Sequence, residues 1–234
     1  MGWLVTNRSQ THVVSSAHFI VSMDHPSRDA AESVSNALEA AYQPVARRLE
    51  TPPAPRIRVN VYRHRWSYVR ATGHWTASGN IEGVEMIHLL YRGSATPQLA
   101  VHEFVHTVTL KFLLDREATP LDAEAFDRRF ASFPVWLWEA VACYEADQKT
   151  DPQDFDSMRS GRFPDLAELS KRSAGGKIYA VGYTIVEFIE SRWGHQATLR
   201  LIQSYGDTQE ALGVDASEFV RLWQEFAETK YPPG

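Results

Sequence analysis

The pattern of hydrophobic and polar residues changes along the chain. In the first part, stretches of strand character lie on either side of one long helix. Strand character is found at residues 13–23, at 56–62, where Ile57, Val59 and Val61 alternate with polar residues, and at 82–91. Between the first two, residues 27–49 carry apolar side chains three and four positions apart, which predicts a helix that the sequence TPPAP ends.

From Pro97 onward the periodicity is helical. The predicted helices cover residues 98–114, 122–131, 134–148, 178–193, 195–205 and 216–230, and the polar, turn-rich segment 150–165 is predicted as a loop. The sequence therefore predicts an α+β fold. A small mixed α/β part with a β-sheet (residues 1–96) is followed by a mainly helical part (residues 97–234), and the two form one compact catalytic unit with a cleft between them.

The candidate chemistry lies on the predicted helix 98–114, where residues 102–106 read His-Glu-Phe-Val-His. Two histidines four residues apart share one face of a helix and can bind one zinc ion, while Glu103 can accept a proton from a water on the metal. Apolar residues cover most of this helix, so it is expected to be buried, and buried polar groups need partners that a metal can supply. Partly exposed histidines on an amphipathic helix are the alternative.

A catalytic zinc takes three protein ligands and keeps one position open. Residues 134–148 read PVWLWEAVACYEADQ, in which Glu139 stands among apolar residues. A carboxylate in that setting is expected to be paired, and a metal ion is one such partner. Glu145 fits an exposed helix edge better, and Cys143 fits a small buried hydrophobe better than a ligand.

These motifs resemble those of the gluzincin zinc peptidases, specifically the bacterial peptidase-MA-like family, which is related to the aminopeptidase N clan. The second motif of that family reads roughly W-L-x-E-G-x-A-x-Y. The residues that match it are Trp136, Leu137, Glu139, Ala142 and Tyr144, and Ala140 replaces the usual Gly. The resemblance implies a zincin, thermolysin-like fold with Glu139 as the third zinc ligand.

A third stretch, YAVGYTIVEFIESRWG at residues 179–194, also resembles this family. It resembles the Y-x-K-G segment of aminopeptidase-N-type enzymes at Tyr179 and Gly182, with Val181 in place of Lys. The resemblance implies that Tyr179 donates a hydrogen bond to the oxyanion, with Tyr183 as the alternative donor. Aromatic residues of an ordinary packed core would give the same pattern.

The expected function is that of a zinc-dependent metallopeptidase with one Zn²⁺ per chain, held by His102, His106 and Glu139. Glu103 would serve as general base. An endopeptidase is favoured because the G-x-M-E-N segment of aminopeptidases is missing. A peptide or protein substrate is expected to pair with the strand at about residues 83–89. The alternatives are an aminopeptidase, a zinc hydrolase with a non-peptide substrate, or a non-catalytic, zinc-stabilised peptide-binding protein.

Composition narrows the remaining possibilities. A net charge of −5 argues against a nucleic-acid-binding protein, and a single cysteine excludes an internal disulfide. The sequence contains no run of 18 apolar residues, so no membrane-spanning helix is predicted. No secretory signal is recognised either. A cytoplasmic location is therefore the default expectation, and an exported one is expected if another segment precedes this start. The oligomeric state is not predicted. The other histidines are expected outside the metal site, and Arg63, His64, Arg65 and Arg70 in a solvated loop.

Overall fold

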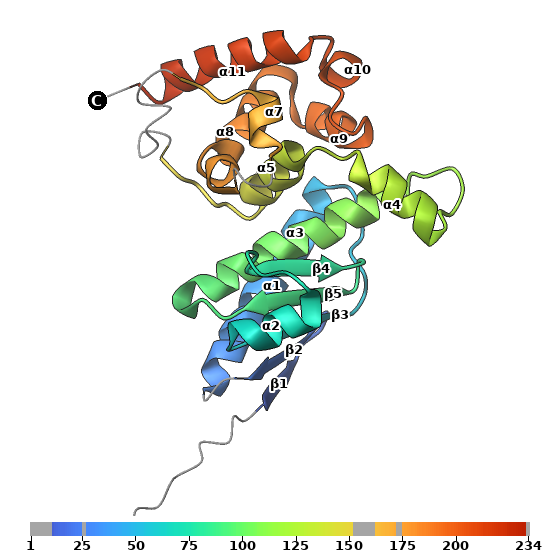
Figure 1. Ribbon diagram of the computed structural model, residues 1–234, viewed down its shortest axis with the longest axis vertical. Helices are drawn as coiled ribbons and strands as arrows, with labels where there is room; N and C mark the ends of the chain where they lie inside the picture. The colour runs from blue at the N-terminus through green and yellow to red at the C-terminus, as the bar shows by residue number, and fades with distance from the viewer. Residues whose placement is uncertain (1–10, 25–26, 152–161, 172–174, 233–234) are drawn as a thin grey trace, which may run out of the picture. The chain divides into compact units, whose positions relative to one another are not determined.

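A computed structural model describes residues 11–24, 27–151, 162–171 and 175–232 of the chain (Figure 1). These residues form two compact units, Met1–Lys111 and Phe112–Gly234. The first contains a β-sheet and the second, in its described ranges, contains helices alone. The coarse prediction of a mixed α/β part followed by a mainly helical part is confirmed. The boundary between the compact units falls within the helix that carries the His-Glu-Phe-Val-His motif.

The first unit is built on a five-stranded sheet with the order β1-β2-β3-β5-β4. The three inner strands β2, β3 and β5 are parallel, and β1 and β4 lie antiparallel at the two edges. The strands are β1 (Thr11–Ser15), β2 (Phe19–Asp24), β3 (Ile57–Tyr62), β4 (Gly79–Glu82) and β5 (Met86–Leu90).

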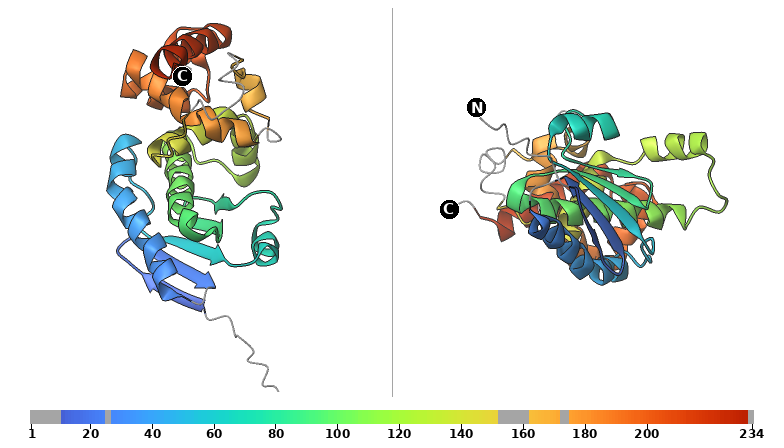
Figure 2. Two further views of the ribbon diagram at one scale, coloured as in Figure 1. Left: turned by 90° about the vertical axis from the view of Figure 1, so that its left-hand side faces the viewer. Right: turned by 90° about the horizontal axis from the view of Figure 1, so that it is seen from below.

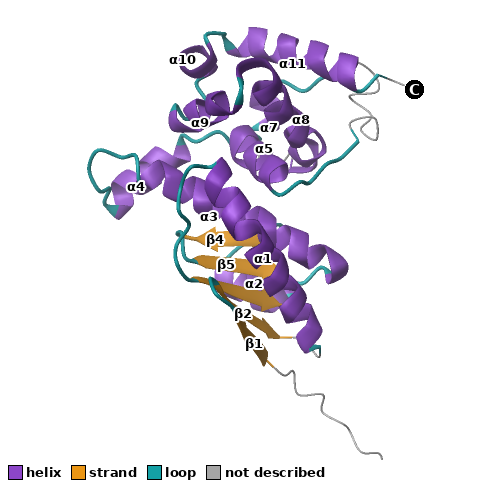
Figure 3. Ribbon diagram, turned by 180° about the vertical axis from the view of Figure 1, so that it is seen from behind, coloured by secondary structure: helices purple, strands orange, loops and turns teal. Residues whose placement is uncertain are grey.

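The two faces of the sheet differ in polarity because side chains alternate along each strand. On one face Phe19, Val59 and Ile87 are fully buried, beneath α1 (Arg28–Arg48) and α3 (Thr96–Leu114) (Figure 3). The ring centroid of Phe19 lies 5.3 Å from that of Phe104 on α3. The opposite face is more polar and is partly covered by α2 (Arg65–Thr72), so the strands lie between α1 and α2 (Figure 2).

The structure corrects two local predictions in this unit and confirms a third in part. The stretch 13–23 is two strands rather than one, because the chain reverses at Ser16, whose amide donates to the Phe19 carbonyl oxygen at 2.9 Å. The strand predicted at 82–91 is confirmed in its second half as β5, but Glu82 belongs to the unpredicted strand β4, and the β4–β5 hairpin turns through Gly83 at a φ of 62°. The predicted loop around Arg65 and Arg70 is the helix α2.

The hairpin changes which strand is available for a substrate. The strand predicted for substrate pairing, at residues 83–89, is largely β5, and β5 is hydrogen-bonded on both sides by β3 and β4. That prediction is therefore wrong. The edge strand on this side of the sheet is β4, whose existence the short sequence Gly-Asn-Ile-Glu did not reveal.

The second unit is helical throughout its described ranges. Its helices are α4 (Ala123–Ala131), α5 (Val135–Glu145), α7 (Leu166–Leu169), α8 (Gly175–Trp193), α9 (His195–Gln203), α10 (Thr208–Leu212) and α11 (Ala216–Lys230). The longer helices agree with the predicted segments within a few residues, whereas α7 and α10 were not predicted. Of the predicted loop 150–165, residues 152–161 lie outside the described residues.

Helices α5 and α8 of this unit pack closely against each other. A Cβ atom built on Gly182 of α8 would lie 3.1 Å from the Cα atom of Ala140 on α5. Small residues on both helices therefore allow their backbones to approach, and this contact fixes the positions of the candidate residues that the two helices carry. No membrane-spanning helix is found within the described ranges.

Candidate metal centre

Helix α3 places the candidate metal ligands in a buried environment. It begins at Thr96, whose hydroxyl accepts a hydrogen bond from the Arg92 amide at 2.8 Å. Apolar residues on all sides of the helix, among them Phe104, Val105 and Val108, are fully buried. The polar residues of the motif are buried with them, at exposed fractions of 3% for His102, 7% for Glu103 and 4% for His106.

The three side chains come together as the spacing predicts. The imidazole rings of His102 and His106 stand 4.7 Å apart between centroids and nearly perpendicular, at 89°. One ligand atom from each of His102, Glu103 and His106 lies within 4.8 Å of the others, and the group can hold a metal ion. Imidazole nitrogens and a carboxylate are a donor set typical of zinc, so the residues fit the metal that the motif predicts.

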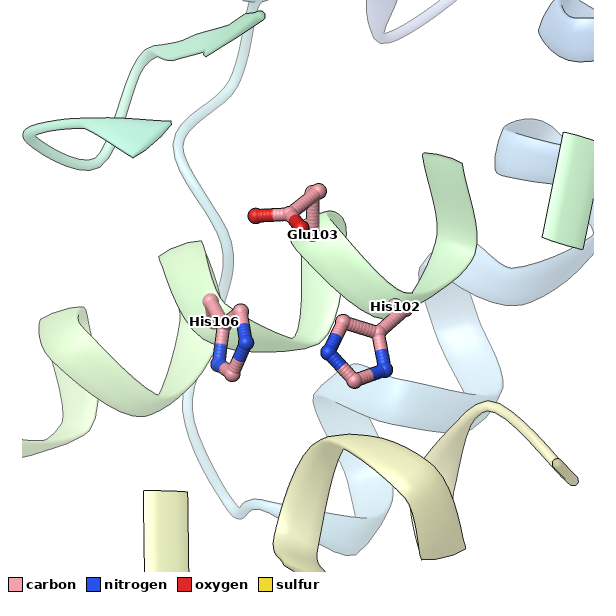
Figure 4. A group of neighbouring side chains, drawn as sticks. All are labelled: His102, Glu103 and His106. Carbon is pink, nitrogen blue, oxygen red and sulfur yellow. The ribbon is translucent and has the colours of Figure 1, made fainter. Parts of the chain in front are cut away.

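The side chains of the two histidines and of Glu103 leave helix α3 in different directions. Figure 4 shows the two imidazoles side by side along α3, and the Glu103 carboxylate on another side of the same helix. Consecutive residues are turned by about 100° around an α-helix, which accounts for the divergence. The carboxylate therefore leaves the helix in a different direction from the two imidazoles, although one ligand atom of each residue still lies within 4.8 Å of the others.

Glu103 packs directly against the edge strand β4. Position 79 pairs with Leu89 and so faces α3, as Leu89 does. A Cβ atom built on Gly79 would lie 2.0 Å from Glu103 Oε1 and 2.6 Å from its Cγ atom. The space that a side chain would need at position 79 is therefore occupied by the Glu103 side chain, and any larger residue there would require Glu103 to move.

A buried tyrosine also lies near Glu103. Burial, and next the neighbouring Glu103 carboxylate, raise the pKa of Tyr68 on α2 to about 12. The Tyr68 phenol consequently keeps its proton over the working pH range, and no second negative charge develops beside Glu103 from this side.

The other predicted site residues lie in the second unit. Glu139 is half-buried on α5, and Cys143 is a buried free thiol. The two candidate tyrosines of α8 differ in accessibility: Tyr179 is 44% exposed and Tyr183 is 8% exposed. The Tyr183 ring packs 4.9 Å from that of Tyr144. The zinc-ligand role of Glu139 and the oxyanion role of Tyr179 stay predictions.

Several of the remaining histidines have side-chain partners of their own. The pairs are His18 Nδ1 with Glu39 at 2.7 Å, His88 Nδ1 with the Tyr62 hydroxyl at 2.9 Å and His195 Nδ1 with Glu190 at 2.8 Å. Each therefore has a structural role that does not require a metal.

Gly79 is the site residue that sequence reasoning missed. A glycine within a strand often marks a close approach by another group, and that signal was present. The glycine could not be interpreted in this way because the strand β4 was not predicted from the sequence. Without the strand, position 79 could not be assigned to either face of the sheet.

Comparison with known proteins adds no assignment. No family model matches the chain, and no curated protein matches it.

Proposed function

We propose that this protein is a zinc-dependent metallopeptidase, as its resemblance to the gluzincin peptidases implies. The observation that carries the proposal is the buried group of His102, Glu103 and His106 on one helix. Two imidazoles that one helix brings together beside a carboxylate are a donor set that zinc takes in proteins. The Glu103 carboxylate of this group lies against Gly79 of the edge strand β4.

In this proposal His102 and His106 hold the metal together with Glu139, the third ligand that the resemblance implies. A zinc ion bound there would lower the pKa of a water molecule and polarise a carbonyl group. Three protein ligands leave one position open for substrate or water, as in other catalytic zinc sites.

The proton transfers and the stabilisation of the oxyanion are carried out by side chains of the protein. The Glu103 carboxylate accepts a proton from the attacking water and passes it to the leaving nitrogen as the C–N bond breaks. The Tyr179 hydroxyl donates a hydrogen bond to the carbonyl oxygen while negative charge develops on it. The exposure of Tyr179 favours it over the buried Tyr183 for a role that requires access to substrate.

The edge strand β4 supports the proposal that the substrate is an extended peptide. Within the described sheet β4 is paired on one side only, by β5, so its other side can pair with a peptide backbone. Gly79 of this strand lies against Glu103, so a peptide paired there would lie close to the proposed base. Backbone pairing is possible on both sides of a scissile bond, which favours an endopeptidase.

The test combines metal analysis with cleavage of a quenched-fluorescence peptide library. We expect about one zinc per chain in the wild type and in Glu103→Gln, with hydrolysis reduced by roughly 100-fold or more in the variant. Glu85→Gln, on the exposed side of the same hairpin, is the matched control and should retain activity. Glu139→Gln should lower zinc occupancy, whereas Glu145→Gln on the same helix should not.

The outcomes separate the alternatives. Undiminished turnover in Glu103→Gln would remove Glu103 from the mechanism. If peptides blocked at the amino terminus are inert while free-amino dipeptides are trimmed, the protein is an aminopeptidase. Zinc binding without cleavage of any peptide would favour a non-peptide substrate or a peptide-binding protein without catalysis.

A further inference from the structure

Two tryptophans beside the sheet are unusually exposed. Trp66 on α2 is 72% exposed and Trp75, shortly after the helix, is 55% exposed. Their ring centroids lie 4.7 Å apart and their planes meet at 82°. Indoles are the largest apolar side chains, and an exposed edge-to-face pair of them is the kind of apolar surface that often marks an interaction site.

The segment that carries these indoles is basic although the protein as a whole is acidic, and the acidic residues Glu82 and Glu85 follow directly after it. Residues 51–81 contain five arginines and no Asp or Glu, whereas the whole chain has a net charge of −5. Arg63 and Arg70 are exposed, and Arg70 follows Trp66 by four residues on α2, so the two share one face of the helix.

This surface is held in place by its own unit. The Tyr68 side chain, on the same helix, is fully buried and packs against Tyr62 of β3 at 6.0 Å between ring centroids. The Arg65 guanidinium donates a hydrogen bond to the Ala77 carbonyl oxygen and so ties α2 to the segment that leads into β4. Gly73 ends the helix in the left-handed region at a φ of 77°. The indoles are therefore presented by a fixed helix and turn.

We propose that Arg63, Trp66, Arg70 and Trp75, the indole–arginine surface, bind the headgroup region of a membrane that contains anionic lipids. Indoles favour the boundary between headgroups and acyl chains, and arginines favour lipid phosphates. The two indoles are perpendicular to each other and both are exposed, so both can enter the headgroup region. They do not form the flat platform on which consecutive bases or sugar rings stack.

The experiment is co-sedimentation of the full chain with vesicles of phosphatidylcholine alone or of phosphatidylcholine mixed with phosphatidylserine. We expect binding to the mixed vesicles, weakened by added salt, and little binding to the neutral ones. Trp66→Ala/Trp75→Ala should weaken binding by roughly tenfold or more, because both indoles leave the interface. Arg63→Gln/Arg70→Gln should weaken it by about fivefold for each arginine.

Matched controls test for effects of charge or surface in general. Arg28→Gln/Arg128→Gln removes two exposed arginines elsewhere and should leave binding unchanged. Val13→Ser removes another exposed apolar side chain, on β1, and should also have no effect. All substituted side chains are exposed, so thermal unfolding should stay close to that of the wild type.

Absence of binding to the mixed vesicles overturns the proposal. Equal binding by the tryptophan double variant and the wild type would also overturn it, as would binding of a single-stranded oligonucleotide without binding of vesicles. None of these outcomes depends on metal content or peptidase activity, so the proposed function and the membrane proposal can fail separately.

Discussion

Replacing Gly79 by alanine probes the contact between the edge strand and the proposed base. The new methyl carbon would lie 2.0 Å from Glu103 Oε1, 2.4 Å from Cδ and 2.6 Å from Cγ, whereas ordinary contact begins near 3.4 Å. The carboxylate must therefore retreat by about 1.4 Å. The methyl group itself cannot move, because it is fixed to a strand backbone that is hydrogen-bonded to β5.

Two effects of different size follow from this displacement. The clashing atoms are the end of a flexible side chain, so Glu103 can swing aside. The loss of stability is then expected at the low end of the range for overpacking, about 1 kcal/mol. A displacement of about 1 Å at a catalytic group can reduce turnover by roughly 100-fold. Gly79→Ala should thus remain folded, retain zinc and lose most of its peptidase activity.

The assay measures urea unfolding, zinc content and peptide turnover on the same preparations. Gly83→Ala is the matched control, because its Cβ atom meets nothing within 4 Å while its φ of 62° disfavours alanine. It should lose a similar amount of stability, about 1 kcal/mol, and keep its activity. A double-mutant cycle with Glu103→Ala isolates the contact, since without the Glu103 side chain Gly79→Ala should cost nothing.

Two results would refute this reasoning. If Gly79→Ala destabilises Glu103→Ala as much as the wild type, the clash is not with Glu103. If Gly79→Ala retains full turnover in a protein whose Glu103→Gln variant is inactive, the position of the carboxylate against β4 does not matter for catalysis.

Further predictions concern the metal, the oxyanion donor and the effect of pH. His106→Ala should lower zinc affinity by at least about 100-fold in competition with a chelator, and full occupancy would disprove the ligand assignment. Tyr179→Phe should lower kcat more than it changes KM, whereas Tyr183→Phe should affect mainly thermal stability; the reverse pattern would exchange their roles. Burial raises the pKa of the Glu39 carboxyl, but hydrogen bonds from Ser16 and His18 outweigh it and hold the pKa below its ordinary value. The stabilisation by Glu39 is therefore present above the pKa of an unfolded glutamate, about 4.3, and is lost as the pH falls through the lower folded pKa. Glu39→Gln should lower the Tm at neutral pH and much less in acid, and an equal difference at both pH values would contradict this.

The sequence determined much of the local structure and the centre of the candidate site. Long helices with regularly spaced apolar residues, such as α1 and α3, agree with their predicted ranges. Helix α1 buries one apolar stripe and α3 buries most of its surface, and both patterns can be recognised in the sequence. The grouping of His102 and His106 also follows from sequence alone, since a spacing of four residues brings side chains together on any α-helix.

Tertiary structure decided what depends on contacts between distant segments. The short strand β4 has no hydrophobic period of its own and forms because it pairs with β5. Because of this pairing the edge strand is β4 rather than the predicted strand at residues 83–89, and position 79 faces α3. Neither the need for glycine at that position nor its contact with Glu103 can be read from local sequence, because both arise only when a strand and a helix from separate segments pack together.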